Sequence, residues 1–288
     1  MPAGGSPIAG VPPPRLYVLP ARKAPVAIVL RRGPSEWFHI LRWHLDDPRL
    51  EPGAWLHGTL YPRRCSISPD GRLLAYFALT SRPPPWDAYH AVSRAPWLTA
   101  LAAWHVGSTW TAGLAFADDG ALLHARGDDP APSHGRYPGP MRPLPPPSGA
   151  GRTPFDERDV ANELRRGWTP ADAGSPHVAA GAVIVLRRAR PGTPGDALLL
   201  VHRGHRFGAP NVEGARIEYL LESGGEAVPL AGIVWADWDA RGRLLVAGAD
   251  GSIEIRHRAP HGWEALWRHD LGGLTPDPQA PPEWATRW

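Results

Sequence analysis

The chain carries 13 histidines, and two pairs of them have spacings typical of metal ligands or of proton-transfer groups. These pairs are His202-x-x-His205 and His257-x3-His261. A zinc site needs further ligands, and neither pair has a third ligand in a recognisable pattern. The single cysteine, Cys65, excludes both a paired-cysteine site and an intrachain disulfide. We therefore expect no metal site in this chain.

Acids and serines give no stronger catalytic signal. Asp237-x-Asp239, close to Gly242, matches part of a calcium-binding loop, but the other ligand positions of such a loop are absent. Ser66 and Ser68 do not lie in a nucleophile-elbow sequence, and no glycine-rich phosphate loop separates a strand from a helix. We expect a structural turn at Asp237 and no bound cofactor.

The elements that would position such side chains are best seen in Trp235–His257 (WADWDARGRLLVAGADGSIEIRH). The residues up to Gly242 predict a polar turn, because aspartate bonds nearby backbone N–H groups and glycine accepts a positive φ. The apolar run RLLVA follows this turn. An Asp-Gly hairpin signal then leads into SIEIRH, which alternates between apolar and polar residues. The segment predicts three short antiparallel strands joined by tight turns.

Two weaker copies of this pattern occur at Cys65–Leu79 (CSISPDGRLLAYFAL) and Ala112–Gly127 (AGLAFADDGALLHARG). The pattern resembles the blades of WD-repeat and TolB-like β-propellers, although Arg256-His257 stands where a WD repeat has its closing Trp-Asp pair. The resemblance implies an all-β fold of five to seven propeller-like blades of short antiparallel strands. An ordinary antiparallel sandwich with Asp-Gly hairpins is the alternative.

A longer repeat is also present, because Val26–Arg32 (VAIVLRR) recurs as Ala182–Arg188 (AVIVLRR). Each copy leads through a turn into a second apolar stretch, FHILRW in the first case and ALLLVH in the second. This repeat predicts that the chain consists of two similar halves.

We expect a disordered N-terminus at residues 1–15 and a single propeller-like domain over residues 16–288. An insertion at residues 128–176 interrupts that domain. Its first part is rich in proline, which donates no backbone hydrogen bond, so we expect an exposed loop without strands there. Its second part predicts one short helix, capped by Thr153 and ended by Gly167.

Composition limits the class of partner. The chain has 31 basic and 28 acidic residues, giving a net charge of +3, and its arginines are spread along the sequence. Nucleic-acid binding needs a basic face, so we do not expect it. No uninterrupted apolar run is long enough to span a bilayer, and the N-terminus does not resemble a secretion signal. We expect a soluble, cytoplasmic protein.

We expect a non-catalytic module that binds a ligand or a partner, and we expect that partner to be a protein. The alternative is a propeller hydrolase whose acids and histidines meet at a central channel, with Asp237, His202 and His124 as candidates. A third reading is binding of a small ligand or glycan through some of the 14 tryptophans.

Overall fold

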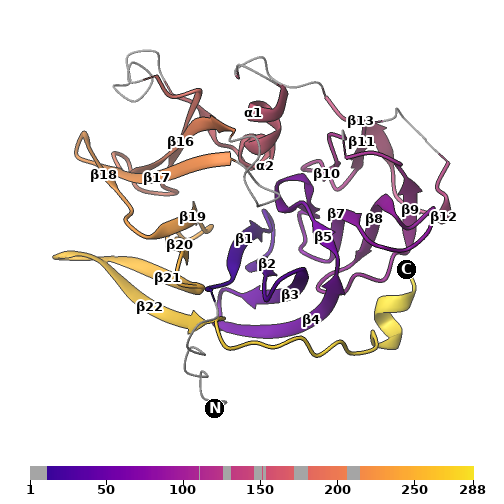
Figure 1. The fold of residues 1–288 in the computed structure, drawn as a ribbon. Coiled ribbons are helices and arrows are strands. Elements are labelled where there is room, and N and C mark those ends of the chain that lie inside the picture. The colour runs from indigo at the N-terminus through magenta and orange to yellow at the C-terminus, as the bar shows by residue number, and fades with distance from the viewer. Residues whose placement is uncertain are drawn as a thin grey trace. The chain divides into compact units, whose positions relative to one another are not determined.

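The computed structural model describes residues 12–109, 111–125, 131–145, 151, 154–171, 181–205 and 215–288 (Figure 1). Within these residues the strands form five small sheets, each a blade-like set of short, mostly antiparallel strands. The predicted all-β, propeller-like fold class is confirmed with five blades. The predicted disordered segment at 1–15 falls largely outside the described residues, although Arg15 already begins a strand.

The chain divides into two compact units. One comprises Met1–Leu16 and Pro147–Leu274, and is called the late unit here. The other comprises Tyr17–Pro146 and Thr275–Trp288, and is called the early unit. The predicted single domain over residues 16–288 stays a prediction.

The early unit holds three sheets (Figure 1). The first is a meander in the order β1-β2-β3-β4. The second has the order β12-β9-β8-β7-β5, with β6 also pairing with β7, and the third has the order β10-β11-β13. The bounds are β1 Arg15–Pro20, β2 Val26–Arg32, β3 Trp37–His44, β4 Arg49–His57, β5 Thr59–Leu60, β6 Ser66–Ile67, β7 Leu73–Leu79, β8 Ala88–Arg94, β9 Ala102–His105, β10 Leu114–Phe116, β11 Leu122–His124, β12 His134–Gly135 and β13 Met141–Pro143, with 3-10 helices at Pro62–Arg64 and Glu283–Thr286.

The late unit holds two antiparallel meanders, β14 to β18 and β19 to β22 (Figure 1). The bounds are β14 Thr169–Pro170, β15 Ile184–Ala189, β16 Ala197–His205, β17 Ala215–Ser223, β18 Glu226–Pro229, β19 Ile233–Trp238, β20 Leu244–Gly248, β21 Ser252–Ala259 and β22 Gly262–Asp270. The two copies of the VLRR repeat occupy β2 and β15, and each is the second strand of its sheet. The repeat therefore marks structurally equivalent strands.

The helical segment differs from its prediction. It forms two short helices, α1 (Pro154–Asp159) and α2 (Ala161–Arg165), where one was expected. The break falls at Val160, whose φ of −116° leaves the helical range and whose side chain is fully buried. Packing of this β-branched side chain therefore outweighs helix continuity. Gly167 ends the segment at φ +90° as expected, while the predicted cap Thr153 lies outside the described residues.

The proline-rich segment also differs from its prediction, because residues 134–135 and 141–143 form strands β12 and β13. The carbonyl oxygens of prolines in this segment can accept hydrogen bonds, and a proline fits where the ladder needs no backbone N–H. The N–H of Leu122 donates to the carbonyl of Pro140 at 2.9 Å. The expectation of a loop without strands was wrong. A proline prevents strand pairing only where its backbone N–H would have to donate a ladder hydrogen bond.

The polar turns of the blade motif are built as their residue types predict, with one correction: Asp237, expected in a turn, lies within strand β19, and the turn begins at Asp239. In the strongest copy, Oδ1 of Asp239 accepts the N–H groups of Arg241 at 2.9 Å and Arg243 at 2.8 Å. Gly242 in this turn has φ +70°. In a weaker copy, Oδ1 of Asp119 accepts the N–H of Ala121 at 3.1 Å. Side-chain acceptors thus close these hairpins in place of a longer ladder.

Replacing Gly242 by alanine should lower stability more than the same change at Gly120. Both glycines have positive φ, so alanine costs about 1 kcal/mol at either position. At Gly242 a Cβ would also lie 2.8 Å from the carbonyl oxygen of Pro191, whereas nothing lies within 4 Å at Gly120. We expect a total loss of about 3 kcal/mol at Gly242, measured by denaturant unfolding. Equal losses in the two variants would contradict the close approach at Gly242.

One buried histidine makes stability depend on pH. His39 lies in a cross-strand row with Arg31 and Trp55, and its ring stacks on Trp55 at 4.1 Å with 7° between the planes. Burial, together with the neighbouring Arg31 charge, lowers the pKa of His39 from 6.5 to about 4. The neutral ring is therefore the form that the folded chain favours.

Acidification should accordingly destabilise the protein through His39. The contribution is complete above pH 6.5 and is lost as pH falls from 6.5 towards 4, by about 3 kcal/mol in total. Unfolding curves measured across this range should show the slope in the wild type and lose most of it in His39→Phe. The exposed His57, on β4 of the same sheet, supplies the control His57→Gln, which should keep the slope. An unchanged slope in His39→Phe would show that other groups cause it.

Candidate functional site

Asp237, the first predicted catalytic residue, is buried on β19 and has both carboxylate oxygens engaged. Oδ1 accepts the N–H of Trp238 at 2.8 Å and lies 2.7 Å from Nε of Arg188. Oδ2 accepts from Nε of Arg166 at 3.1 Å. Because Arg166 follows directly after α2, this carboxylate ties the helical segment to β15 and β19. These contacts are those of a structural anchor.

His202, the second candidate, is fully buried on β16. Its Nδ1 accepts the N–H of Gly204 at 3.1 Å, which places the proton of the neutral ring on Nε2. Nε2 lies 3.4 Å from Oδ2 of Asp159, at the end of α1. Both ring nitrogens therefore face partners within the late unit. The side chain of His205, its neighbour in the sequence motif, lies outside the described residues.

His124, the third candidate, belongs to the early unit and is buried on β11. Its ring lies 5.2 Å from that of Trp104 and 6.2 Å from that of His90. Nε2 of His90 in turn lies 2.6 Å from the hydroxyl of Thr111. The catalytic roles of Asp237, His202 and His124 stay predictions, but His124 packs against a tryptophan that lines a pocket.

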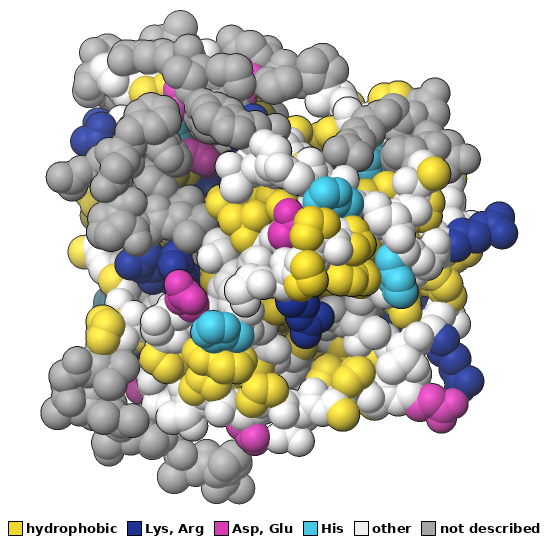
Figure 2. Space-filling model, turned by 45° about the vertical axis from the view of Figure 1, so that its right-hand side comes forward, with side chains coloured by type: hydrophobic (Ala, Val, Ile, Leu, Met, Phe, Trp, Pro, Cys, Tyr) yellow, Lys and Arg dark blue, Asp and Glu magenta, His cyan; other side chains and the backbone are white. Residues whose placement is uncertain are grey.

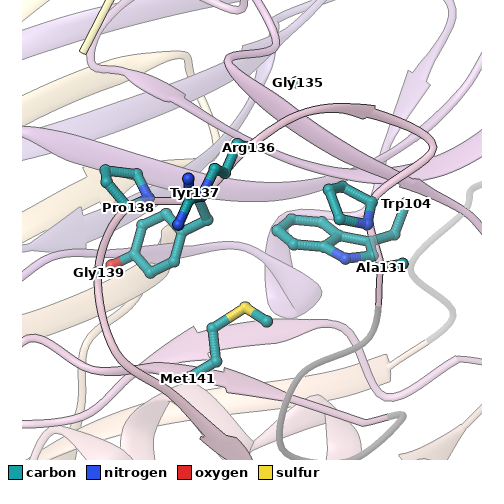
Figure 3. Close-up of a pocket in the computed structure, with 9 residues that line it drawn as sticks. Trp104, Ala131, Gly135, Arg136, Tyr137, Pro138, Gly139 and Met141 are labelled. Atoms are coloured by element: carbon teal, nitrogen blue, oxygen red, sulfur yellow. The ribbon is translucent and has the colours of Figure 1, made fainter.

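That pocket lies in the early unit and has a volume of about 740 Å³. Figure 3 shows Tyr137 and Trp104 on opposite sides of it, with Met141 below them. Ligand pockets in proteins commonly have volumes of about 300–1,000 Å³ and apolar or aromatic walls. The lining residues are Trp104, Ala131, Pro132, Gly135, Arg136, Tyr137, Pro138, Gly139 and Met141.

The pocket exists because residues 136–140, which we call the arch, are held at both ends by strand pairing. Before the arch, β12 pairs with β9, and after it β13 pairs in parallel with β11. Gly135 is required at the first end, since a Cβ there would lie 2.0 Å from the carbonyl oxygen of Leu101. The arch therefore spans the gap between two sheets, next to Trp104 on β9.

The Tyr137 side chain of the arch is held by close neighbours. A Cβ on Gly139 would lie 2.7 to 2.9 Å from atoms of the Tyr137 ring and hydroxyl, so this glycine makes room for the ring. The ring also meets Trp288 edge-on at 5.6 Å. Burial, and secondly the charge of Asp70, raise the pKa of Tyr137, so its hydroxyl stays protonated at neutral pH. The pocket thus contains a fixed, uncharged aromatic ring.

Trp104 contributes an edge of the wall. Its side chain is only 2% exposed because it packs into a core cluster that also holds Val92, Leu114 and Phe116. Tyr137 and Met141 pack against the same cluster. The pocket walls are therefore supported directly by the hydrophobic core, which favours a preformed cavity.

Arg136 supplies the positive charge of the pocket. Its side chain is exposed, and within the described residues no carboxylate forms an ion pair with it. Arg142 on β13 differs, because Asp119 pairs with it directly. Among the described residues, the pocket therefore has an arginine without a carboxylate partner next to an aromatic ring.

Other kinds of site are not found in the part of the chain that the structure describes. No group of three histidine, cysteine, aspartate or glutamate side chains there could hold a metal ion. No helix among those residues is long and apolar enough to cross a membrane.

Sequence reasoning did not find the pocket residues. Arg136, Tyr137 and Met141 lie in the segment assigned to a loop, and Trp104 was one tryptophan among 14. The usable signal was the short pattern His134–Met141 (HGRYPGPM), in which an arginine and a tyrosine stand between glycines and prolines. Such a pattern favours a rigid exposed turn that presents both side chains.

No protein-family model matches this sequence, and the search of curated proteins gave no match. The functional argument therefore depends on the geometry of the site.

Removing the Asp237 carboxylate should destabilise the fold strongly. Asp237→Ala leaves two buried or half-buried guanidinium groups without their common partner, which costs about 3–5 kcal/mol. Glu218→Ala in the same unit breaks an exposed ion pair with Arg203 and should cost less than about 1 kcal/mol. Thermal unfolding of the two variants tests this difference. A wild-type melting temperature for Asp237→Ala would rule out the anchoring role.

Proposed function

We propose that this protein is a non-catalytic binding module that holds a small organic ligand in the pocket beneath the arch. The observation that carries this proposal is a cavity of about 740 Å³ lined by Tyr137 and Met141, which pack against the core, and by Arg136, which has no carboxylate partner among the described residues. Its size suits a ligand of metabolite dimensions.

A catalytic role finds less support in the geometry. Asp237 and His202 direct their polar atoms at partners in the late unit, which favours structural roles for both. Of the described side chains that line the pocket, none is a carboxylate, histidine, serine or cysteine. General acid–base and nucleophilic catalysis depend on such groups, so binding without turnover is the better-supported function.

Protein binding is the second candidate, favoured by apolar side chains exposed on outer strands. Leu266 on β22 is 54% exposed and Val228 on β18 is 53% exposed. Single exposed apolar side chains are normal on protein surfaces, however. On the face drawn in Figure 2, hydrophobic and basic side chains are interspersed with polar ones and form no single large patch. The pocket is the more specific feature.

The proposal is tested by screening a library of small organic molecules against the full chain with ligand-observed NMR. We expect hits whose affinity falls about tenfold or more in Gly139→Ala, since the added methyl group displaces the Tyr137 ring. Gly139 is not at positive φ, so this change introduces no backbone strain. Glu264→Gln, on the exposed strand β22, should bind the hits as the wild type does.

Three outcomes would contradict the proposal. A screen without hits would exclude a small-ligand site of useful affinity. Hits that bind Gly139→Ala as tightly as the wild type would place their site outside the pocket. Conversion of a hit to product by the purified protein would show that the module is catalytic.

A further inference from the structure

We propose that the pocket selects an aromatic carboxylate, whose ring lies against Tyr137 and whose acid group pairs with Arg136. This inference rests on the proposed function, because it names the class of ligand that the same pocket takes. It is carried by the balance of polar groups in the lining and by the charges around the arch.

The charged group among the described side chains of the lining is a donor. Arg136 offers only donors, whereas the hydroxyl of Tyr137 faces the carbonyl of Gly120 at 3.5 Å and Trp104 is 2% exposed. The remaining lining residues are glycine, proline, alanine and methionine, which bring no polar side-chain atoms except a weakly accepting sulfur. A ligand that presents acceptors, such as a carboxylate, complements this lining.

A neutral sugar would have to rely on main-chain carbonyl groups to accept its hydroxyl protons, since the described side chains of the lining include no carboxylate or amide. An aromatic ring needs no such partners and packs well against tyrosine, proline and methionine.

Nearby charges leave Arg136 as the available cation. Arg142 is paired with Asp119, and Arg72 lies 3.8 Å from Asp70. The charge of Asp70 reaches Tyr137, but this carboxylate already accepts from the hydroxyl of Ser68 at 2.5 Å and from the N–H of Arg72 at 3.1 Å. The acid group of the ligand is therefore expected at Arg136, where no described carboxylate competes.

The ring position is set by the neighbours of Tyr137. Gly139, Trp288 and the carbonyl of Gly120, which lies 3.5 Å from the tyrosine hydroxyl, hold the ring in place. Figure 3 shows this ring and Trp104 on opposite sides of the pocket, with Met141 beneath. A planar ligand that enters this space meets an aromatic surface on one side and the methionine thioether below.

The test compares naphthoate with its neutral analogue naphthamide, by titration into the wild type and three variants. We expect naphthoate to bind about tenfold more tightly than naphthamide, and Arg136→Gln to remove that preference. Arg142→Gln is the matched control, since Arg142 lies outside the lining and already has an acid partner. It should bind naphthoate as tightly as the wild type does.

The outcomes separate the ligand class from the pocket itself. If both compounds bind equally and both are weakened in Gly139→Ala, the pocket binds ligands but does not select anions. Tighter binding of glucuronate than of naphthoate would contradict the aromatic ligand and show that the pocket prefers a sugar acid. No binding of any of the three compounds would overturn this inference, while library hits weakened by Gly139→Ala would still support the proposed function. Binding that is insensitive to Gly139→Ala, for these compounds and for the library hits alike, would overturn both.

Discussion

The functional account depends on one constraint, which is the main-chain pairing of a proline-rich segment at its two ends. Gly135 approaches the carbonyl of Leu101 so closely that no other residue fits, and Met141 pairs with Leu122 in the parallel contact of β13 with β11. Because its two ends pair with different sheets, the arch between them bridges the two sheets. The position of the pocket, the exposure of Arg136 and the placement of Tyr137 all follow from those two attachments.

In the late unit, side-chain ion pairs attach the short helical segment to the sheets. Its helical segment is too short to be stable alone, so it must be fastened to the sheets. The Asp237 carboxylate does this by pairing with Arg166 after α2 and with Arg188 on β15. A second tie joins Asp159 to His202. The polar atoms of Asp237 and His202 thus face partners within the late unit, while the candidate site is built largely from main-chain pairing, aromatic rings and an arginine.

Features encoded by adjacent residues were predictable from the sequence. The turns around Asp119 and Asp239 followed from an acceptor side chain with a nearby glycine, and the VLRR repeat correctly marked two equivalent strands. Features that depend on distant partners were not. The break at Val160 depends on where its side chain is buried, and the pocket joins Trp104 and Tyr137 from separate segments. No local pattern reports such contacts.

The measurement that tests the pocket most directly uses the NMR signal of Met141, which lines it and is one of two methionines in the chain. In methyl-labelled protein, Met141→Leu identifies the Met141 signal. Because an aromatic ring strongly shifts a methyl group that it covers, saturating naphthoate should move the Met141 signal. A Met141 signal that does not respond while naphthoate binds would show that the ligand site lies elsewhere and would contradict the account.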